Sequence, residues 1–157
     1  MIFLDSSFII GYKIENDEHH HKAIKLMGKI SEGTYGKAVI SDYVFDESVT
    51  VLLNKSKDLS VSIELGNELR NSLKIMSIDK FVFEESWELF KEQKNTKLSF
   101  TDCTIITVMK NNGIENIATF DEDFNSQFDV GRSLMPAPFE FVISGFSAFV
   151  VFCFSSF

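Results

Sequence analysis

The chain opens with Ile2-Phe3-Leu4-Asp5-Ser6-Ser7-Phe8-Ile9-Ile10, in which an apolar run is followed by one aspartate, two serines and a second apolar run. Consecutive apolar residues of this kind are typical of a strand that is buried on both faces of a parallel sheet. Asp5 then falls at the carboxyl end of the strand, and a serine hydroxyl can cap the helix that follows. The segment therefore predicts a buried strand, an acidic strand end and a helix in direct succession.

The same alternation of strand and helix continues along the chain. Ala38-Val39-Ile40 and Ile117-Ala118-Thr119 predict two further strands, and residues 74–77 are a candidate for another. The helices expected between them cover residues 17–29, 42–53, 61–72, 80–94 and 101–110. Ser41 is suited to cap the second of these helices, and Asn111-Asn112-Gly113 to end the last. Alternating strands and helices favour parallel pairing through right-handed crossovers, hence an α/β sheet with helices on both faces.

Composition narrows the function classes. The chain has 157 residues, 45% of them hydrophobic, with 15 basic against 23 acidic side chains and a net charge of −8. This balance argues against a protein that grips nucleic acid by bulk electrostatics, but it allows an enzyme whose acidic residues hold cations. Two cysteines are too few for a disulfide framework, and the acidic start does not resemble a signal peptide. We therefore expect a cytoplasmic protein.

The C-terminal part differs in character from the rest. We expect one domain over residues 1–134 and an atypical phenylalanine-rich tail over residues 135–157. Residues 141–157 carry no charge and include six phenylalanines, and their length is at the short limit for a membrane-spanning helix. Three interpretations stay open for this tail: a strand or helix packed on the domain or on a second subunit, an end foreign to the fold, and a membrane contact. Membrane contact is the weaker expectation, because serines interrupt the segment and no basic cluster flanks it.

Two acidic residues are predicted to lie on apolar helix faces. Glu47 shares its helix face with Val44 and Val51, whereas its neighbour Asp46 falls on a polar face. Asp102 lies three, four and seven residues before apolar side chains of its own helix, namely Ile105, Ile106 and Met109. A carboxylate that projects toward a core is costly unless it is paired or bound to a metal.

Two further acids follow strands. Asp5 and Asp121 come after apolar runs and are placed at the carboxyl edge of the sheet, where open α/β sheets bind ligands. Because Glu47 and Asp102 lie near the starts of their helices, all four carboxylates can converge at this edge. Unpaired, they would raise one another's pKa values, and Mg²⁺ or Mn²⁺ with oxygen ligands is the simplest remedy.

Each acid also has an ordinary structural explanation. Asp5 alone is suited to cap a helix, and Glu47 alone to pair with Lys55 or Lys22. Asp102 is favoured near a helix N-terminus by the helix dipole, and Asp121 fits a solvated loop.

Four motifs in this order resemble those of the PIN-domain family, and in particular its VapC-like members. They are Phe-Leu-Asp-Ser-Ser (3–7), Ile-Ser-Asp-Tyr-Val-Phe-Asp-Glu-Ser-Val-Thr-Val-Leu (40–52), Leu-Ser-Phe-Thr-Asp-Cys-Thr-Ile (98–105) and Ala-Thr-Phe-Asp-Glu-Asp-Phe (118–124). The resemblance spans residues 1–124 and implies a three-layer α/β/α fold with a central parallel sheet. It also implies a ribonuclease that depends on Mg²⁺ or Mn²⁺ and cleaves single-stranded RNA.

The resemblance also assigns residue roles. The metal-binding and catalytic acids would be Asp5, Glu47, Asp102 and Asp121, with Asp123 as an auxiliary metal-binding acid and Ser6 and Thr101 as hydroxyls that orient the site. A bound ion would hold the scissile phosphate and lower the pKa of an attacking water. The tail departs from the short closing strand of the family.

The expected partners are an RNA substrate, a small antitoxin that blocks the acidic crevice, and a second copy of the chain in a homodimer. Two alternatives stay open: a housekeeping PIN nuclease for RNA processing, and a catalytically silent PIN-like module that binds a partner through its hydrophobic tail. A phosphotransfer protein fits less well, because serines follow Asp5 where an acidic neighbour is needed.

Other conspicuous residues receive structural interpretations. We expect His19, His20 and His21 to form a solvated helix face, and Cys103 to lie in the core. Phe83, Trp87 and Phe90 recur at helical spacing, so we expect a buried aromatic stripe.

Overall fold

The computed structural model describes residues 1–94, 97–124, 139–142 and 150–154, the last two ranges as backbone strands only. In chain order the elements are β1 (Ile2–Leu4), α1 (Ser6–Lys13), α2 (His20–Ser31), β2 (Ala38–Ser41), α3 (Asp42–Ser56), α4 (Leu59–Ser72), β3 (Lys74–Met76), α5 (Lys80–Glu92), α6 (Phe100–Asn112), β4 (Asn116–Thr119), β5 (Phe139–Val142) and β6 (Val150–Phe154). The predicted alternation of strands and helices is confirmed.

The centre of the molecule is a parallel sheet with the order β3-β2-β1-β4. The register pairs Phe3 of β1 with Val39 of β2 on one side and with Ile117 of β4 on the other. Both neighbours of β1 are thus parallel to it, and all three residues of β1 are buried. This burial on both faces explains why the strand is entirely apolar.

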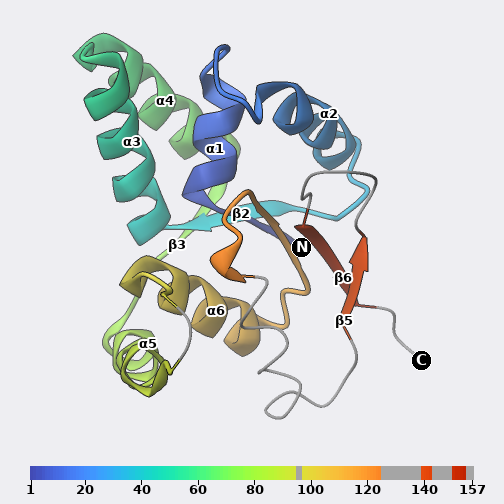
Figure 1. Cartoon of the computed structure of the whole chain (residues 1–157), viewed down its shortest axis with the longest axis vertical. Coiled ribbons are helices and arrows are strands. Elements are labelled where there is room, and N and C mark those ends of the chain that lie inside the picture. Colours follow the sequence, from blue (N-terminus) through green and yellow to red (C-terminus); the bar gives the residue numbers. More distant parts are fainter. Residues whose placement is uncertain (95–96, 125–138, 143–149, 155–157) are drawn as a thin grey trace.

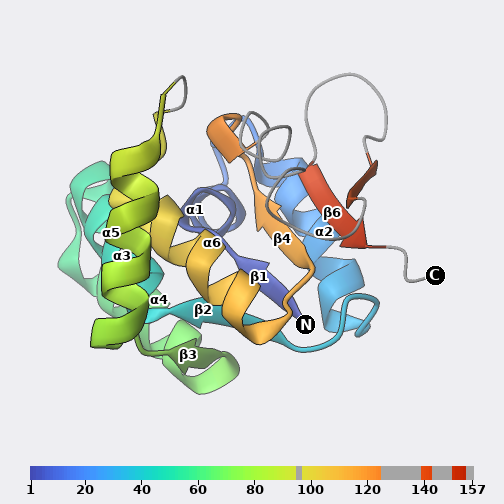
Figure 2. The same cartoon turned by 90° about the horizontal axis from the view of Figure 1, so that it is seen from below.

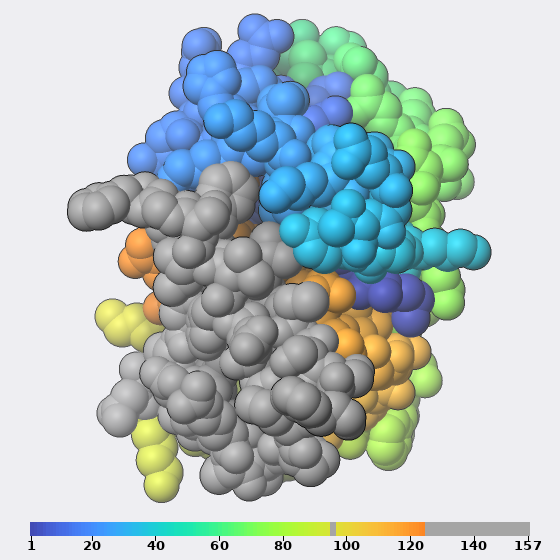
Figure 3. Space-filling model, turned by 90° about the vertical axis from the view of Figure 1, so that its right-hand side faces the viewer, coloured from blue at the N-terminus to red at the C-terminus, as the bar shows by residue number. Residues whose placement is uncertain are grey.

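Two layers of helices enclose the sheet. The chain moves from β1 to β2 to β3 in one direction and then returns across the sheet to β4. Because parallel crossovers are right-handed, the return connection lies on the opposite face. Figure 1 shows α1 to α4 on one side of the sheet and α5 with α6 on the other, and Figure 2 shows β1 and β4 between α6 and α2. In the space-filling view of Figure 3, the residues of α2 (blue) lie above those of α6 (orange). The fold is therefore the expected three-layer α/β/α arrangement.

Local signals set the helix boundaries. The Ser41 hydroxyl accepts a hydrogen bond from the Val44 amide and so caps α3 as expected, while α6 ends at Gly113 with a φ of 59°. At the start of α1 the carboxylate of Asp5, rather than a serine hydroxyl, is the N-cap, which confirms the alternative explanation given for Asp5 as a helix cap. The helix predicted from residue 17 begins only at His20, because the Asp17 carboxylate accepts from the His19 amide in a turn that precedes it.

Part of the C-terminal segment extends the same sheet. β6 pairs antiparallel with β4, and β5 pairs antiparallel with β6. This pairing agrees with the interpretation of the tail as packed on the domain. The predicted boundary between residues 134 and 135 lies outside the described residues, so it stays a prediction. Among the residues that the structure describes, no helix is long and apolar enough to cross a membrane.

The aromatic stripe on α5 is not buried as expected. Phe83 is 40% exposed and Trp87 is 42% exposed, although both rings lie against the ring of Phe100 at the start of α6. Helical spacing correctly placed the aromatic residues on one face, but contact with Phe100 leaves much of that face exposed. Cys103 lies in the core, as expected.

Candidate active site

The strand order places the acidic residues at a point where α/β sheets bind ligands. From β1 the chain runs outward to β2 and β3, whereas β4 lies on the other side of β1. The sheet therefore has a topological switch point between the carboxyl ends of β1 and β4. Asp5 directly follows β1, and Asp121 comes two residues after β4. The two acids thus reach one edge of the sheet from segments far apart in the sequence.

Asp5 is held in a network of hydroxyl groups. It is only 2% exposed. Its Oδ2 accepts hydrogen bonds from Ser7 Oγ at 2.6 Å and from Thr119 Oγ1 at 2.7 Å, and its Oδ1 accepts from the Ser6 amide at 2.6 Å. Burial raises the pKa of Asp5, these hydrogen bonds lower it, and the charge of Asp121 raises it further. The net shift is upward, so ionisation of this carboxyl is disfavoured without a compensating cation.

Ser7 and Thr119 are site residues that the sequence motifs did not single out. The Ser7 hydroxyl also accepts from the Phe120 amide at 2.9 Å, and the Thr119 hydroxyl accepts from the Asp121 amide at 3.0 Å. Together they connect the end of β1 to the loop after β4. A threonine that ends an apolar strand directly before Phe-Asp was the available signal.

Glu47 faces the same site from the second turn of α3. Burial raises its pKa, the charges of Asp5 and Asp121 add to this effect, and a hydrogen bond from the Ser6 side chain opposes it. The Ser6 hydroxyl also lies 3.4 Å from Asp5 Oδ1. Ser6 thus stands between two of the predicted acids, in keeping with an orienting role. Lys55 does not pair with Glu47, since its ammonium forms an ion pair with Asp17 at 3.6 Å.

Asp102 is buried in the first turn of α6 by a capping box. Its Oδ2 accepts from the Ser99 amide at 2.7 Å, while the Ser99 hydroxyl accepts from the Asp102 amide at 3.1 Å. Burial raises the pKa of Asp102 to about 7, with contributions from the charges of Asp5 and Asp121 that the hydrogen bonds to Ser99 partly offset. The structural explanation by helix position therefore holds, and the capped side chain still lies close enough to Asp5 and Asp121 for their charges to raise its pKa.

The remaining predicted residues lie nearer the surface. Asp121 is partly buried, and its Oδ1 accepts from the Asp123 amide at 2.8 Å. Asp123 itself is exposed, and its charge is not among the causes that raise the pKa of Asp5, Glu47 or Asp102. Thr101 precedes Asp102. Its backbone carbonyl oxygen accepts a hydrogen bond from the Thr104 hydroxyl, whereas its own hydroxyl forms no hydrogen bond with a described residue. The structure therefore gathers four acids and Ser6 more closely than Asp123 and Thr101.

The four carboxylates form a negative cluster without an internal counter-charge. Asp5, Glu47 and Asp102 all have raised pKa values with a neighbouring acid among the causes. None of the four takes part in a salt bridge with a described residue. Their donor set, oxygen only and partly desolvated, fits a hard divalent cation. In the described part of the chain, however, no three acidic, histidine or cysteine side chains lie close enough to share one ion.

Comparison with known proteins identifies the family. Residues 2–127 match the family model described as the PIN domain. The chain belongs to the PIN-domain family. The chain is 25% identical over 126 residues to the 23S rRNA-specific endonuclease VapC20 of Mycobacterium tuberculosis, in a match that covers 80% of this chain and 93% of that protein.

Solved structures agree on the fold of this PIN domain. The crystal structure of Mycobacterium tuberculosis VapC20, described as a sarcin-ricin loop cleaving toxin, superposes with a TM-score of 0.72 at 23% identity, covering 81% of this chain and 95% of that one. A toxin–antitoxin complex from Klebsiella pneumoniae matches with a TM-score of 0.55 at 17% identity, covering 79% and 90%.

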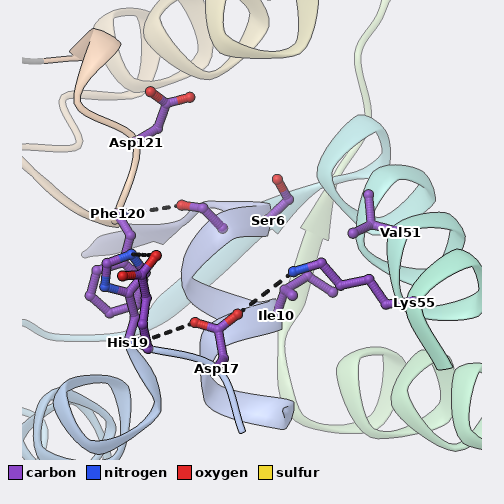
Figure 4. Close-up of a pocket in the computed structure, with 10 residues that line it drawn as sticks. Ser6, Ile10, Asp17, His19, Val51, Lys55, Phe120 and Asp121 are labelled. Atoms are coloured by element: carbon purple, nitrogen blue, oxygen red, sulfur yellow. Dashed lines mark hydrogen bonds and ion pairs between the residues drawn. The ribbon is translucent and has the colours of Figure 1, made fainter.

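A pocket of about 330 Å³ opens beside the acids of this PIN domain. Two residues of the acidic site, Ser6 and Asp121, line this pocket. It extends from them to Asp17, His19, Lys55 and Phe120 (Figure 4). The His19 ring stacks on the Phe120 ring with centroids 4.3 Å apart. The expectation of a solvated histidine face is thus wrong for His19, and also for His20, whose Nδ1 lies 3.0 Å from the Gly11 carbonyl oxygen. The loop between α1 and α2 folds these residues back onto α1.

Proposed function

We propose that the protein is a metal-dependent endoribonuclease that hydrolyses RNA phosphodiester bonds at the four-carboxylate site, and that it acts as the toxin of a toxin–antitoxin pair. The observation that carries this proposal is the convergence of Asp5, Glu47, Asp102 and Asp121 at the switch point of the sheet without a cationic partner among the described residues. A cluster kept at a cost to folding is better explained by a ligand than by stability. The endonuclease named among the relatives supports RNA as the substrate.

The roles of the residues follow from their surroundings. Asp5, Glu47, Asp102 and Asp121 would hold Mg²⁺ or Mn²⁺, which when bound supplies phosphate binding and a more acidic water. Ser6, together with Ser7 and Thr119, keeps the carboxylates of the site oriented. Because the pKa of Asp102 is about 7, this side chain holds a proton in part of the molecules at neutral pH. It must lose that proton to act as a ligand, so metal affinity should rise with pH.

Asp123 and Thr101 take secondary roles in this proposal. Asp123 would act as an auxiliary acid, since its amide already donates to Asp121. Thr101 would contact substrate or water, because its hydroxyl makes no hydrogen bond with the described residues.

The biological setting is part of the same proposal. A small antitoxin would cover the acidic edge, and the named toxin–antitoxin complex among the solved structures supports such a partner. We further propose that the protein forms a homodimer and acts in the cytoplasm. Size-exclusion chromatography with light scattering tests the dimer, and growth arrest on expression, relieved by Asp102→Asn, tests the toxin.

Cleavage of mixed-sequence single-stranded RNA by the wild type, in Mn²⁺, Mg²⁺ or EDTA, is the direct test of the activity. Asp102→Asn keeps an oxygen that accepts from the Ser99 amide, so it should fold while losing a ligand charge. Asp46→Asn is the matched control, because Asp46 is exposed on α3 and its charge affects the pKa of Glu47 less than burial and the charges of Asp5 and Asp121 do. We expect cleavage that requires the metal, survives Asp46→Asn and disappears in Asp102→Asn.

Two results would contradict the proposal. Cleavage that persists in Asp102→Asn would come from a contaminant or from another site. A folded wild type that cleaves no RNA in either metal, and whose thermal transition does not respond to Mn²⁺, would favour a binding module instead.

A further inference from the structure

The pocket beside the acids has a chemistry different from theirs. Two sides meet in it: an aromatic wall, formed by His19 and Phe120, and a polar edge, formed by Asp17 and Lys55. Figure 4 shows the ring pair on one side of the pocket, the Asp17–Lys55 pair beside Ile10, and the Asp121 carboxylate pointing away from both. The volume, about 330 Å³, is at the lower end of the range for small-molecule sites, roughly 300–1,000 Å³. One flat ring system fits such a space.

The aromatic wall is built by close packing against α1. The rings of His19 and Phe120 are nearly parallel, with 13° between their planes. A side chain at Gly11 would meet Phe120 Cε2 at 3.1 Å and His19 Cβ at 3.4 Å, so the two rings would have to shift to admit it. His19 Nδ1 is buried and has no hydrogen-bond partner among the described residues. The imidazole is positioned by stacking on Phe120, and its Nε2 lies 3.8 Å from Glu18 Oε1. The side chain stays 32% exposed, so the ring can be reached by a ligand.

The polar edge offers an acceptor and a donor side by side. Asp17 accepts from the His19 amide at 3.0 Å, and its other oxygen lies 3.6 Å from Lys55 Nζ. That distance is too long for a strong hydrogen bond, so the carboxylate and the ammonium both keep bonding capacity. The side chain of Asp17 is only 16% exposed, which fixes it in place.

We propose that this pocket binds a guanine base of the RNA strand, next to the phosphate held at the acidic site. Guanine presents N1–H and N2–H donors to a carboxylate and O6 as an acceptor to a lysine along one edge. Single-stranded RNA is commonly read in this way, by stacking on aromatic rings and by hydrogen bonds to base edges. The inference rests on the proposed ribonuclease function, because it assigns a base of the same substrate.

The charges of the pocket disfavour a phosphate group as its occupant. Asp17, Glu18 and Asp121 line it, against Lys55 as the single lysine or arginine among the described lining residues. An anion would be repelled, whereas a neutral base with both donors and acceptors is not. A guanidinium group of a protein partner is the competing occupant, and the experiment includes it.

The first experiment measures nucleotide binding without turnover. Guanosine, inosine, adenosine and cytidine 5′-monophosphates, which contain no phosphodiester bond to cleave, are titrated into the full chain in Mg²⁺, with affinities taken from ligand-observed NMR. The cation is included because the uncompensated acids would otherwise repel the phosphate of every nucleotide. We expect guanosine monophosphate to bind about tenfold tighter than the adenosine and cytidine nucleotides, with inosine monophosphate, which lacks the N2 amino group, between them. Equal affinities, or tighter binding of N-acetyl-arginine amide that displaces guanosine monophosphate, would overturn the proposal.

Two variants distinguish the contribution of the polar edge of the pocket from that of its aromatic wall. Asp17→Asn keeps an acceptor for the His19 amide but presents an amide donor to the base, so the preference for guanine should fall about tenfold. Glu15→Gln makes the same charge change on an exposed residue of the same loop, outside the pocket, and should have no effect. His19→Ala should weaken all four nucleotides by a similar factor, about tenfold, since stacking does not discriminate between bases. Retention of the guanine preference in Asp17→Asn would contradict the assignment.

Cleavage assays distinguish failure of this inference from failure of the proposed function. Metal-dependent cleavage whose rate does not change when any guanine is replaced by inosine would leave the nuclease standing and overturn the pocket. Selective binding of guanosine monophosphate without any RNA cleavage would support the pocket and count against the nuclease. If guanine-containing RNA fails to displace the mononucleotide, the pocket serves a free nucleotide, and its assignment to RNA is wrong.

Discussion

Two groups of carboxylates in this PIN domain differ in how their charge is compensated. Between α1 and α4, Lys13 forms ion pairs with Glu64 at 3.4 Å and with Glu68 at 3.0 Å, and both glutamates are largely exposed. Burial lowers the pKa of Lys13, but the hydrogen bonds and charges of Glu68 and Glu64 raise it by more, so the lysine stays charged. At the carboxyl edge of the sheet, Asp5, Glu47, Asp102 and Asp121 have no such cation among the described residues.

The difference shows why a net charge of −8 by itself says little about function. The pair of glutamates on α4 shares Lys13 as a counter-charge and is otherwise solvated, so it needs no ligand. The edge cluster is partly desolvated and its members repel one another, so a cation from outside should be worth more there than at the two glutamates. Substitutions that are identical in chemistry should therefore have different consequences in the two groups.

The largest expected effect comes from one substitution made in both groups. Glu47→Gln should reduce RNA cleavage by more than about 100-fold, since loss of residues that merely support metal ligands already costs roughly 10–100-fold. Glu68→Gln should leave cleavage unchanged. The measurement is the initial rate of cleavage at saturating Mn²⁺, with circular dichroism to show that both variants fold. Equal losses in the two variants would show that the edge cluster has no special role.

The second prediction concerns stability against pH in EDTA. Asp5, Glu47 and Asp102 have raised pKa values in the folded protein, so the folded state binds more protons than the unfolded state above about pH 4. For Asp102 this range extends to about pH 7. Stability contributed by these groups is therefore lost as the pH rises through this range. For Asp102, a shift from 3.8 to about 7 corresponds to at most about 4 kcal/mol.

Urea unfolding of the wild type and Asp102→Asn at several pH values checks this second prediction. The free energy of unfolding of the wild type should fall more steeply from about pH 4.5 to about pH 7 than that of the variant. Asp102→Asn should accordingly be the more stable protein at neutral pH in EDTA, and saturating Mn²⁺ should reverse that order. Parallel curves for the two proteins would contradict the raised pKa of Asp102.

The sequence could place the four acids at one edge of the sheet because strand ends and helix faces leave a periodic signature. Asp5 follows a fully apolar run, and Glu47 and Asp102 interrupt apolar helix faces, so each could be assigned to one edge of a parallel sheet. The capping box of α6, in which Ser99 is followed three residues later by Asp102, also leaves a mark in the sequence. That capping box explains why the carboxylate of Asp102 can be buried.

The pocket and the aromatic surface were beyond reach of the same reasoning. His19 and Phe120 are far apart in sequence, and only the loop between α1 and α2 brings their rings together at Gly11. Helical spacing placed Phe83 and Trp87 on one face, but whether that face is covered depends on how α5 packs on α6. Such properties arise from contacts between elements rather than from the pattern within one.

A smaller effect is expected at the hydroxyls that hold Asp5. Ser7→Ala removes a 2.6 Å hydrogen bond to Asp5 Oδ2 and leaves the Phe120 amide without its acceptor. We expect about a tenfold loss of kcat, within the roughly 10–100-fold range for groups that orient metal ligands. The apparent affinity for Mn²⁺ should fall with it, whereas KM for RNA should not change. If only KM for RNA rises and kcat is unchanged, Ser7 contacts the substrate instead. Ser60→Ala is the matched control, because Ser60 is an exposed residue of α4.

The smallest effect is expected from breaking the compensated group. Lys13→Met removes both ion pairs but keeps an unbranched apolar side chain on α1. Because exposed ion pairs contribute about 0–1 kcal/mol, the free energy of unfolding should fall by less than about 1 kcal/mol, and less still in high salt. Cleavage should be unchanged, although the substitution adds to the negative charge of the protein as a whole. If Lys13→Met instead alters metal affinity at the edge, then total charge, and not the local arrangement of the four carboxylates, governs binding there.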